Sequence, residues 1–175
     1  NNITETAVIN QVIILVGGFG TRIKLVSNGL PKALMPVGEL VYLDLLLDKI
    51  FKNNINHVYL SLHYKPLLFQ DYINNSIFKN KLTCVIEPYP LGTGGAVNYV
   101  IENSSISSSF FVMNGDSMSN INLKKMYEEF LGQNLTAMIG LSKVEDTERY
   151  GTVLSKAGKV MSFEEKGVTG PGWIN

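Results

Sequence analysis

Apolar positions along the chain follow two spacings, one typical of strands and one typical of helices. Short, mostly apolar runs predict strands at residues 12–16, 57–62, 82–86, 110–113 and 136–141. Apolar residues that recur every three or four positions predict helices between them, at residues 43–51, 67–73, 96–101 and 123–131. From Tyr150 onward the pattern changes to short strands and turns. Strands that alternate with helices of this length indicate an α/β fold with a mainly parallel sheet and helices on both faces.

Composition places the chain among globular proteins and narrows its partners. Of its 175 residues, 45% are hydrophobic and 17% are charged, which fits one domain with a substantial core. The 15 basic residues balance the 15 acidic ones, so we expect no nucleic acid as partner. No apolar run is long enough to span a membrane, and the polar start lacks the features of a secretory signal. Together with the single Cys84, which fits a reducing compartment, these features predict a cytoplasmic protein.

A glycine-rich loop directly follows the first predicted strand. Its glycines, Gly17, Gly18 and Gly20, let backbone N–H groups approach a ligand closely, and Thr21 and Arg22 add a hydroxyl and a positive charge. The dinucleotide fingerprint is not met, because an isoleucine stands where its third glycine belongs, and the Walker sequence Gly-Lys-Ser/Thr is absent. The loop therefore predicts a polyphosphate site of another kind.

Lys32 supplies a second cation ten residues after Arg22. Either residue can be an ordinary solvated surface charge. Because Pro31 fixes the backbone before Lys32, the lysine is better placed than a typical loop residue, and we favour a phosphate-binding role for both cations. Lys24 is expected at the surface.

Two further segments follow the ends of predicted strands. The segment 87–95 contains Glu87, Gly92, Thr93, Gly94 and Gly95, whose glycines either permit tight packing or let a flat base lie against the backbone; we favour the base. The strand at 110–113 is followed by Asn114, Gly115 and Asp116. Asp116 is either a turn-forming residue or, as we favour from its nearness to the phosphate loop, a ligand of Mg²⁺. Because ligands bind beyond the carboxyl ends of parallel strands, the three segments are expected to meet at one edge of the sheet.

The C-terminal part offers a weaker signal. Lys166 either pairs with a neighbouring glutamate at the surface or neutralises a second phosphate while Glu165 accepts from sugar hydroxyls, and the residues alone favour neither. His57 and His63 have no carboxylate or cysteine at ligand spacing and are expected to be structural.

These motifs resemble those of the sugar-1-phosphate nucleotidyltransferases, also called nucleotide-sugar pyrophosphorylases. The sequence Gly-Gly-x-Gly-Thr-Arg at 17–22, with Pro-Lys at 31–32, is the family signature, and the later motifs occur in the family's order. The resemblance implies a Rossmann-like three-layer α/β/α fold of the nucleotide-diphospho-sugar transferase type. Within the family, the sequences at 90–96, 149–153 and 162–166 are most similar to D-glycero-D-manno-heptose 1-phosphate guanylyltransferases.

The resemblance implies a role for each site residue. The triphosphate would be held by Gly17, Gly18, Gly20, Thr21 and Arg22, and nucleotide binding is further expected of Glu87, Gly92, Thr93, Gly94, Gly95, Asn114 and Gly115. Catalysis is expected to depend on Arg22, Lys32, Asp116 and Lys166, with Asp116 binding Mg²⁺. Gly151, Glu165, Lys166 and Asn175 would hold the sugar.

The implied reaction transfers a nucleotidyl group from an NTP, with GTP favoured, to a sugar 1-phosphate, releases pyrophosphate and supplies polysaccharide synthesis. Residues 1–11 are expected to form an extension and residues 12–175 the nucleotidyltransferase domain. Family members continue past the position of Asn175, so we expect that domain to be short at its C-terminus. This leaves a non-catalytic binding or regulatory module as the alternative, and a homo-oligomer as a further expectation.

Overall fold

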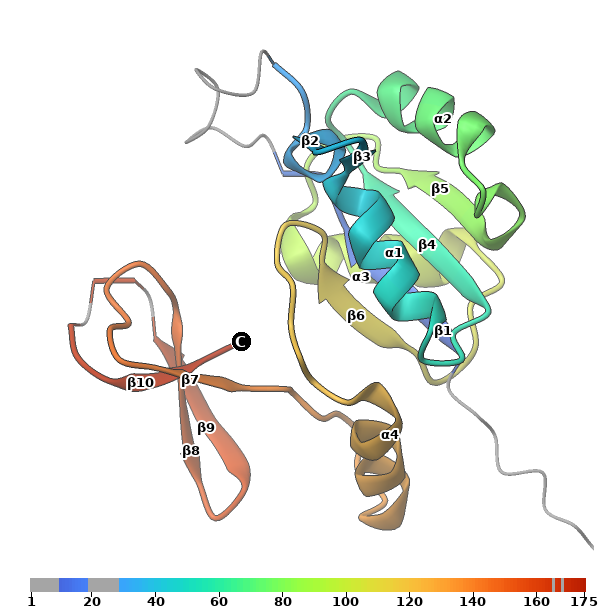
Figure 1. Ribbon diagram of the computed structural model, residues 1–175. Coiled ribbons are helices and arrows are strands. Elements are labelled where there is room, and N and C mark those ends of the chain that lie inside the picture. Colours follow the sequence, from blue (N-terminus) through green and yellow to red (C-terminus); the bar gives the residue numbers. More distant parts are fainter. Residues whose placement is uncertain (1–9, 19–28, 165, 168) are drawn as a thin grey trace, which may run out of the picture. The chain divides into compact units, whose positions relative to one another are not determined.

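A computed structural model describes residues 10–18, 29–164, 166–167 and 169–175 of the chain. The chain divides into two compact units, Asn1–Ser119 and Asn120–Asn175. Each has a sheet of its own (Figure 1).

The first unit is built on a four-stranded parallel sheet with the strand order β5-β4-β1-β6. Its strands are β1 (Gln11–Leu15), β4 (His57–Leu62), β5 (Leu82–Ile86) and β6 (Phe111–Asn114). Its helices are α1 (Tyr42–Phe51), α2 (Pro66–Asn75) and α3 (Gly92–Asn103), with 3₁₀ turns η2 (Lys32–Leu34) and η3 (Lys79–Lys81) and a small hairpin of β2 (Pro36–Val37) and β3 (Leu40–Val41).

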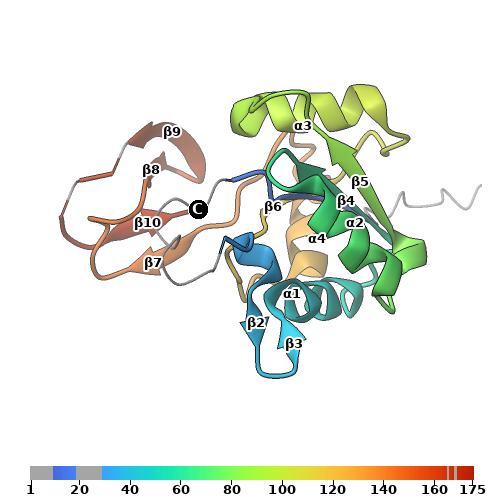
Figure 2. The same ribbon diagram turned by 90° about the horizontal axis from the view of Figure 1, so that it is seen from above.

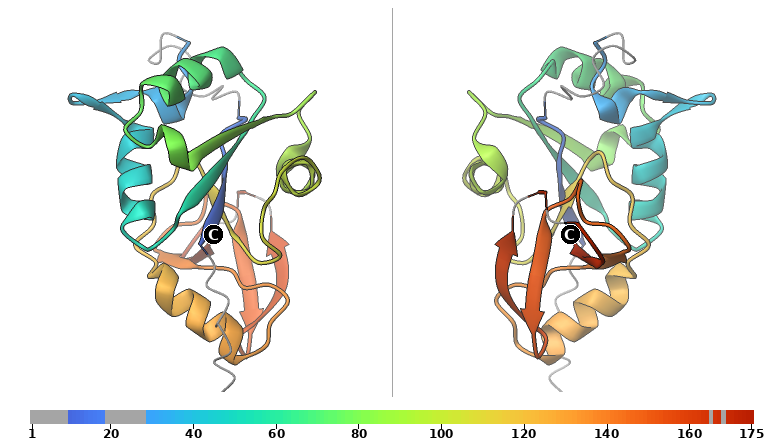
Figure 3. Two further views of the ribbon diagram at one scale, coloured as in Figure 1. Left: turned by 90° about the vertical axis from the view of Figure 1, so that its right-hand side faces the viewer. Right: turned by 90° about the vertical axis from the view of Figure 1, so that its left-hand side faces the viewer.

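Helices cover both faces of this sheet, with α3 on one face and α1 and α2 on the other (Figures 2 and 3). Because side chains alternate along a strand, β1 serves both faces. Ile13 packs with Tyr59, Val85 and Val100 beneath α3, whereas Val12 and Ile14, also fully buried, point to the opposite face. The predicted three-layer α/β/α fold with a parallel sheet is therefore confirmed.

The second unit consists of α4 (Leu123–Gly132) and a four-stranded sheet with the order β7-β10-β8-β9. Its strands, β7 (Ser142–Val144), β8 (Thr152–Lys156), β9 (Lys159–Glu164) and β10 (Gly172–Ile174), pair antiparallel. Asn122 begins α4 by accepting a hydrogen bond from the Lys125 amide at 3.0 Å. Ala157 and Gly158, both with positive φ, form the tight turn between β8 and β9.

One predicted strand is wrong. Residues 136–141 form no strand; the chain pairs only from Ser142, and it does so within the antiparallel sheet. A short apolar run predicts a buried segment but supplies no neighbouring strand for its backbone groups, and within the described residues none pairs with this segment.

Candidate active site

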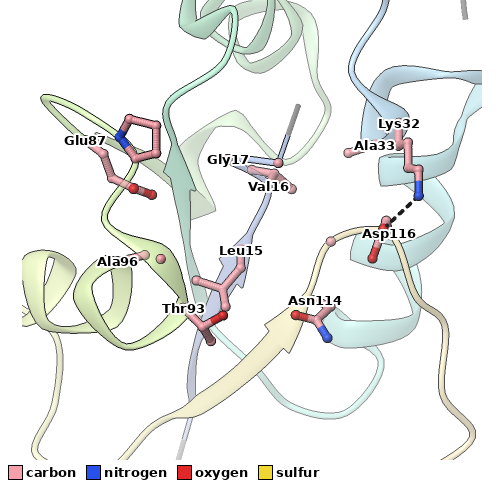
Figure 4. Close-up of a pocket in the computed structure, with 14 residues that line it drawn as sticks. Leu15, Val16, Gly17, Lys32, Ala33, Glu87, Thr93, Ala96, Asn114 and Asp116 are labelled. Carbon is pink, nitrogen blue, oxygen red and sulfur yellow. Dashed lines mark hydrogen bonds and ion pairs between the residues drawn. The ribbon is translucent and has the colours of Figure 1, made fainter. Parts of the chain in front are cut away.

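A cavity of about 500 Å³ opens at the carboxyl ends of β1, β5 and β6 in the first unit (Figure 4). Its wall combines backbone of the glycine loop, the η2 turn, the start of α3 and the end of β6. The lining residues are Leu15, Val16, Gly17, Gly18, Lys32, Ala33, Glu87, Pro90, Gly92, Thr93, Ala96, Asn114, Gly115 and Asp116. The three segments expected at one edge of the sheet therefore do meet there.

The end of β1 brings bare backbone to this cavity. A Cβ atom built on Gly17 would lie 3.3 Å from Oε1 of Glu87, so a side chain here would require the Glu87 carboxylate to shift by a few tenths of an ångström. A Cβ on Gly18 would meet nothing within 4 Å. Gly20, Thr21 and Arg22, the other predicted residues of this loop, lie outside the described residues.

Gly115 sets how closely the end of β6 approaches β1. Its amide donates to the Leu15 carbonyl at 2.9 Å. A Cβ there would lie 2.1 Å from Cγ1 of Val16, a β-branched side chain with little room to move. Only glycine therefore allows this approach, and the approach places Asp116 at the cavity.

Lys32 and Asp116 form an ion pair on one side of the cavity, with Nζ 3.1 Å from Oδ2 (Figure 4). Pro31 precedes the lysine at φ −57°, as the sequence predicts for a fixed backbone. The two side chains are 33% and 47% exposed, so solvent screens the pair and its contribution to stability is about 1 kcal/mol or less. Because the pair is weak and partly exposed, its ammonium and its carboxylate can each bind a charged ligand instead.

Tyr42, at the start of α1, lies close enough to sense this charge. Burial, and then the Asp116 carboxylate, raise the pKa of the Tyr42 hydroxyl. Its phenol therefore stays neutral at physiological pH, and the sequence pattern did not single it out.

Asp116 offers one carboxylate at this cavity, which is a suitable ligand for a hard divalent cation. Asp116 is half-exposed, and Mg²⁺ is commonly held by one or two carboxylates together with substrate phosphates. In the part of the chain that the structure describes, no three His, Cys, Asp or Glu side chains gather into a metal cluster. Among the described residues, Asp116 is therefore the one predicted metal ligand at this cavity.

Glu87 lies on the other side of the cavity from the ion pair (Figure 4). Its side chain is 6% exposed. Oε1 accepts from the Ser61 hydroxyl at 2.9 Å, and Oε2 accepts from the Leu91 amide at 3.1 Å, just before α3 begins. Neutral donors therefore hold this buried carboxylate.

The glycines at the start of α3 have different environments. Gly92 has φ +70°, a conformation that favours glycine, and lines the cavity beside Thr93. Gly94 and Gly95 do not line it, and a Cβ on Gly95 would lie 2.9 Å from Cβ of Leu91. Tight packing accounts for Gly95, and a nucleotide-binding role for Gly94 and Gly95 stays a prediction.

The predicted sugar residues lie in the second unit. Gly151 precedes β8, and a Cβ there would lie 3.3 Å from the Glu164 carbonyl oxygen. Lys166 and Asn175 are exposed, and Glu165 lies outside the described residues. This unit has a cavity of about 310 Å³ lined by neighbours of these residues, including Thr152, Glu164 and Trp173, but not by Gly151, Lys166 or Asn175.

Comparison with known proteins places this geometry in a family. The profile of the Nucleotidyl transferase family matches residues 11–171. The chain belongs to the nucleotidyl transferase family. It is 33% identical over 165 residues to D-glycero-alpha-D-manno-heptose 1-phosphate guanylyltransferase of Aneurinibacillus thermoaerophilus, covering 94% of this chain and 71% of the relative. The enzyme of the same name from Campylobacter jejuni is 33% identical over 166 residues, covering 94% and 72%.

A solved structure agrees with both the sequence match and the fold. The crystal structure of HddC from Yersinia pseudotuberculosis, complexed with GMP-PN, superposes with a TM-score of 0.78 at 32% identity. The match covers 95% of this chain and 74% of that one. The predicted family and the predicted enzyme class, a sugar-1-phosphate nucleotidyltransferase, are therefore confirmed.

His57, predicted to be structural, has a local partner in this nucleotidyltransferase. His57 shares a hydrogen bond of 2.9 Å with the Thr83 hydroxyl. Burial raises the pKa of the Cys84 thiol to about 11, so it stays protonated. Among the described helices, none combines the length and apolar character needed to cross a membrane.

Ser61, which contacts the cavity residue Glu87, is a further residue that the sequence pattern did not single out. It is fully buried and belongs to β4, next to β1 in the sheet. A signal was present, because Ser61 interrupts an otherwise apolar run in the strand at 57–62. A buried polar side chain needs a polar partner, here Glu87.

Proposed function

We propose that this chain transfers a guanylyl group from GTP to D-glycero-D-manno-heptose 1-phosphate, forming an activated sugar for surface polysaccharide synthesis. The observation that carries the proposal is the cavity where the glycine loop, Lys32 and Asp116 meet. The choice of GTP and heptose rests on the names of the two bacterial relatives at 33% identity.

The reaction asks the protein for geometry and charge rather than a nucleophile. An oxygen of the sugar phosphate attacks the α-phosphorus of GTP, a new P–O bond forms, and the bond to the β-phosphate oxygen breaks so that pyrophosphate leaves. Both reactants are anions that repel each other. Fixed donors and cations at the phosphates are therefore the main source of catalysis.

On the nucleotide side, amides of Gly17 and Gly18 and the Lys32 ammonium would donate to phosphate oxygens. Gly20, Thr21 and Arg22 would complete this loop. The base would lie along Gly92 to Gly95, and the remaining nucleotide contacts are assigned to Glu87, Thr93, Asn114 and Gly115. Support for this division comes from the positions of Lys32 and Glu87 on opposite sides of the cavity (Figure 4).

Asp116 would hold Mg²⁺ at the phosphate end. The bound cation would neutralise phosphate charge as it develops. Lys32, now paired with Asp116, would then turn to phosphate oxygens, because both partners of the pair gain a stronger counter-charge.

The second unit would hold the acceptor sugar through Gly151, Glu165, Lys166 and Asn175. Lys166 would face the acceptor phosphate, and the carboxylate and amide would accept from and donate to sugar hydroxyls. A cytoplasmic location follows for the proposal, because GTP and sugar phosphates are cytoplasmic metabolites. A homo-oligomeric state stays a prediction.

The experiment is pyrophosphate release from purified protein with Mg²⁺, tested with four NTPs against a panel of sugar 1-phosphates. We expect GTP with heptose 1-phosphate to be the fastest pair and Asp116→Asn to abolish most of the rate. A different best pair would change the substrate assignment within the same reaction. The non-catalytic alternative is not favoured by the guanylyltransferase relatives. Tight GTP binding without pyrophosphate release from any pair would support that alternative.

A further inference from the structure

The cavity contains a carboxylate whose surroundings are unusual for a site that binds polyanions. Glu87 is 6% exposed, and burying a charge without strong partners is costly. Within the described residues, its oxygens are held by a hydroxyl and an amide rather than by a cation. The two hydrogen bonds, at 2.9 and 3.1 Å, give each oxygen of this buried carboxyl group a donor.

Ser61 connects this carboxylate to the centre of the sheet. Its hydroxyl donates to Oε1 of Glu87, and its carbonyl accepts from the Val16 amide at 3.0 Å, where the chain enters the glycine loop. Ser61 is 0% exposed and stands beside Leu15 in the β1–β4 register. One buried residue therefore contacts both the start of the glycine loop and the carboxylate beside it.

Glu87 also holds the start of α3 through a hydrogen bond. Its Oε2 accepts from the amide of Leu91, the residue before the first residue of α3, Gly92. Amides at the start of a helix have no partner within the helix, so a side-chain acceptor fixes where the helix begins. Oε1 of the same carboxylate lies beside Gly17, where a Cβ would be 3.3 Å away. The carboxylate thus sets the spacing between the glycine loop and the start of α3.

We propose that Ser61 is a positioning residue for nucleotide binding. Its hydroxyl orients the Glu87 carboxylate, which in turn holds Leu91 and Gly92 at the correct distance from Gly17. Without the hydroxyl, Oε1 loses its donor, and the carboxylate turns toward water in the cavity, where it crowds the nucleotide. The inference rests on the proposed function only in taking the ligand of this cavity to be a nucleotide.

The test compares Ser61→Ala, the volume-conserving Ser61→Cys, Glu87→Gln and the double variant Ser61→Ala/Glu87→Gln. GTP affinity is measured by calorimetry, KM and kcat by pyrophosphate release, and exchange of the Leu91 amide by NMR. Ser104→Ala is the matched control, because it removes a side-chain hydrogen bond to Val100 at the other end of the same helix. Thermal unfolding of every variant separates lost stability from lost positioning.

We expect Ser61→Ala and Ser61→Cys to weaken GTP binding about tenfold, with KM for GTP rising more than kcat falls. Exchange of the Leu91 amide should accelerate. In the Glu87→Gln background, Ser61→Ala should change GTP affinity by less than about twofold, because the hydroxyl acts through the carboxylate. Ser104→Ala should leave GTP affinity unchanged even where it lowers the melting temperature as much.

The outcomes separate this inference from the proposed function. GTP affinity within twofold of wild type in both Ser61 variants, or independent, additive effects of Ser61→Ala and Glu87→Gln, overturns the inference while pyrophosphate release still supports the enzyme. If the wild type binds GTP but releases no pyrophosphate, the proposed reaction fails and the affinity series alone decides the inference. If the wild-type protein binds no nucleotide, both the proposed function and the positioning role of Ser61 are overturned.

Discussion

The two units of this protein rest on sheets of opposite character. In the Asn1–Ser119 unit, β1 lies inside a parallel sheet, and Val12, Ile13 and Ile14 are 0% exposed. In the Asn120–Asn175 unit, every residue of β9 is exposed, and Phe163 is 64% exposed. Helices cover both faces of the first sheet (Figure 3). A buried sheet holds its strand ends firmly, which suits a site built from backbone, whereas an exposed hairpin presents side chains.

The largest expected effect is the difference in stability lost when a buried side chain of the first unit and an exposed side chain of the second unit are truncated. Ile14→Ala should lower the free energy of unfolding by about 2–5 kcal/mol, because it leaves a cavity in a fully packed core. Phe163→Ala, a larger truncation, should cost less than about 1 kcal/mol, because most of that side chain already contacts water. Urea denaturation of both variants checks the pair. A Phe163→Ala loss equal to that of Ile14→Ala would show that β9 is covered in solution.

Asp116→Asn tests how much the Asp116 carboxylate in the first unit contributes to kcat. We expect kcat to fall about 10²–10³-fold, since one preorganised charge at the phosphates is lost, while the fold is retained. Asp48→Asn is the matched control, because Asp48 pairs with Lys52 on the surface of α1 at 2.6 Å. Pyrophosphate release is the measurement. Equal losses in the two variants would mean that net charge, and not the position of Asp116, matters.

Two glycine substitutions compare how the units respond to an added methyl group. Gly115→Ala should destabilise by about 1–3 kcal/mol, because its Cβ would lie 2.1 Å from Val16 and 3.0 Å from the Leu15 carbonyl oxygen. At Gly140 in the second unit, the nearest atom, 2.2 Å away, is the terminal Cδ1 of Ile121, which can rotate aside. We expect Gly140→Ala to cost clearly less, as measured by thermal unfolding. The reverse order would contradict the close approach of β6 to β1.

Asn175→Ala sharpens the proposed division of substrates between the units. KM for the sugar 1-phosphate should rise about tenfold, the effect of losing one or two hydrogen bonds, while KM for GTP stays within twofold. The nucleotide serves as the internal control in the same steady-state experiment. A rise confined to GTP would assign this end of the chain to the nucleotide instead.

The smallest effect concerns pH. Burial lowers the pKa of His57 below its ordinary value of 6.5, so the folded state binds its proton less readily than the unfolded state does. Its contribution to stability is therefore complete above pH 6.5 and is lost as pH falls below it. His57→Gln should flatten the fall in unfolding free energy between neutral and mildly acidic pH. An unchanged pH dependence in the variant would place the titration elsewhere.

Much of the first unit was predictable because periodicity reports burial. The strands predicted at 57–62 and 82–86 coincide with β4 and β5, and the first three helical stripes correspond to α1, α2 and α3. The meeting of three segments was also predictable, since the carboxyl ends of parallel strands share one edge. The strand predicted at 136–141 is wrong, because an apolar run carries no information on which strand lies alongside.

By itself, the sequence determined the layered α/β fold and the chemistry brought to the cavity: glycines, Lys32 and Asp116 at strand ends. Only the tertiary structure decided which glycines face that cavity and which pack, as Gly92 and Gly95 do. It also paired Lys32 with Asp116 and Ser61 with Glu87, residues 84 and 26 positions apart. Local spacing encodes burial and backbone freedom, whereas hydrogen bonds between distant residues depend on how strands pair and helices pack.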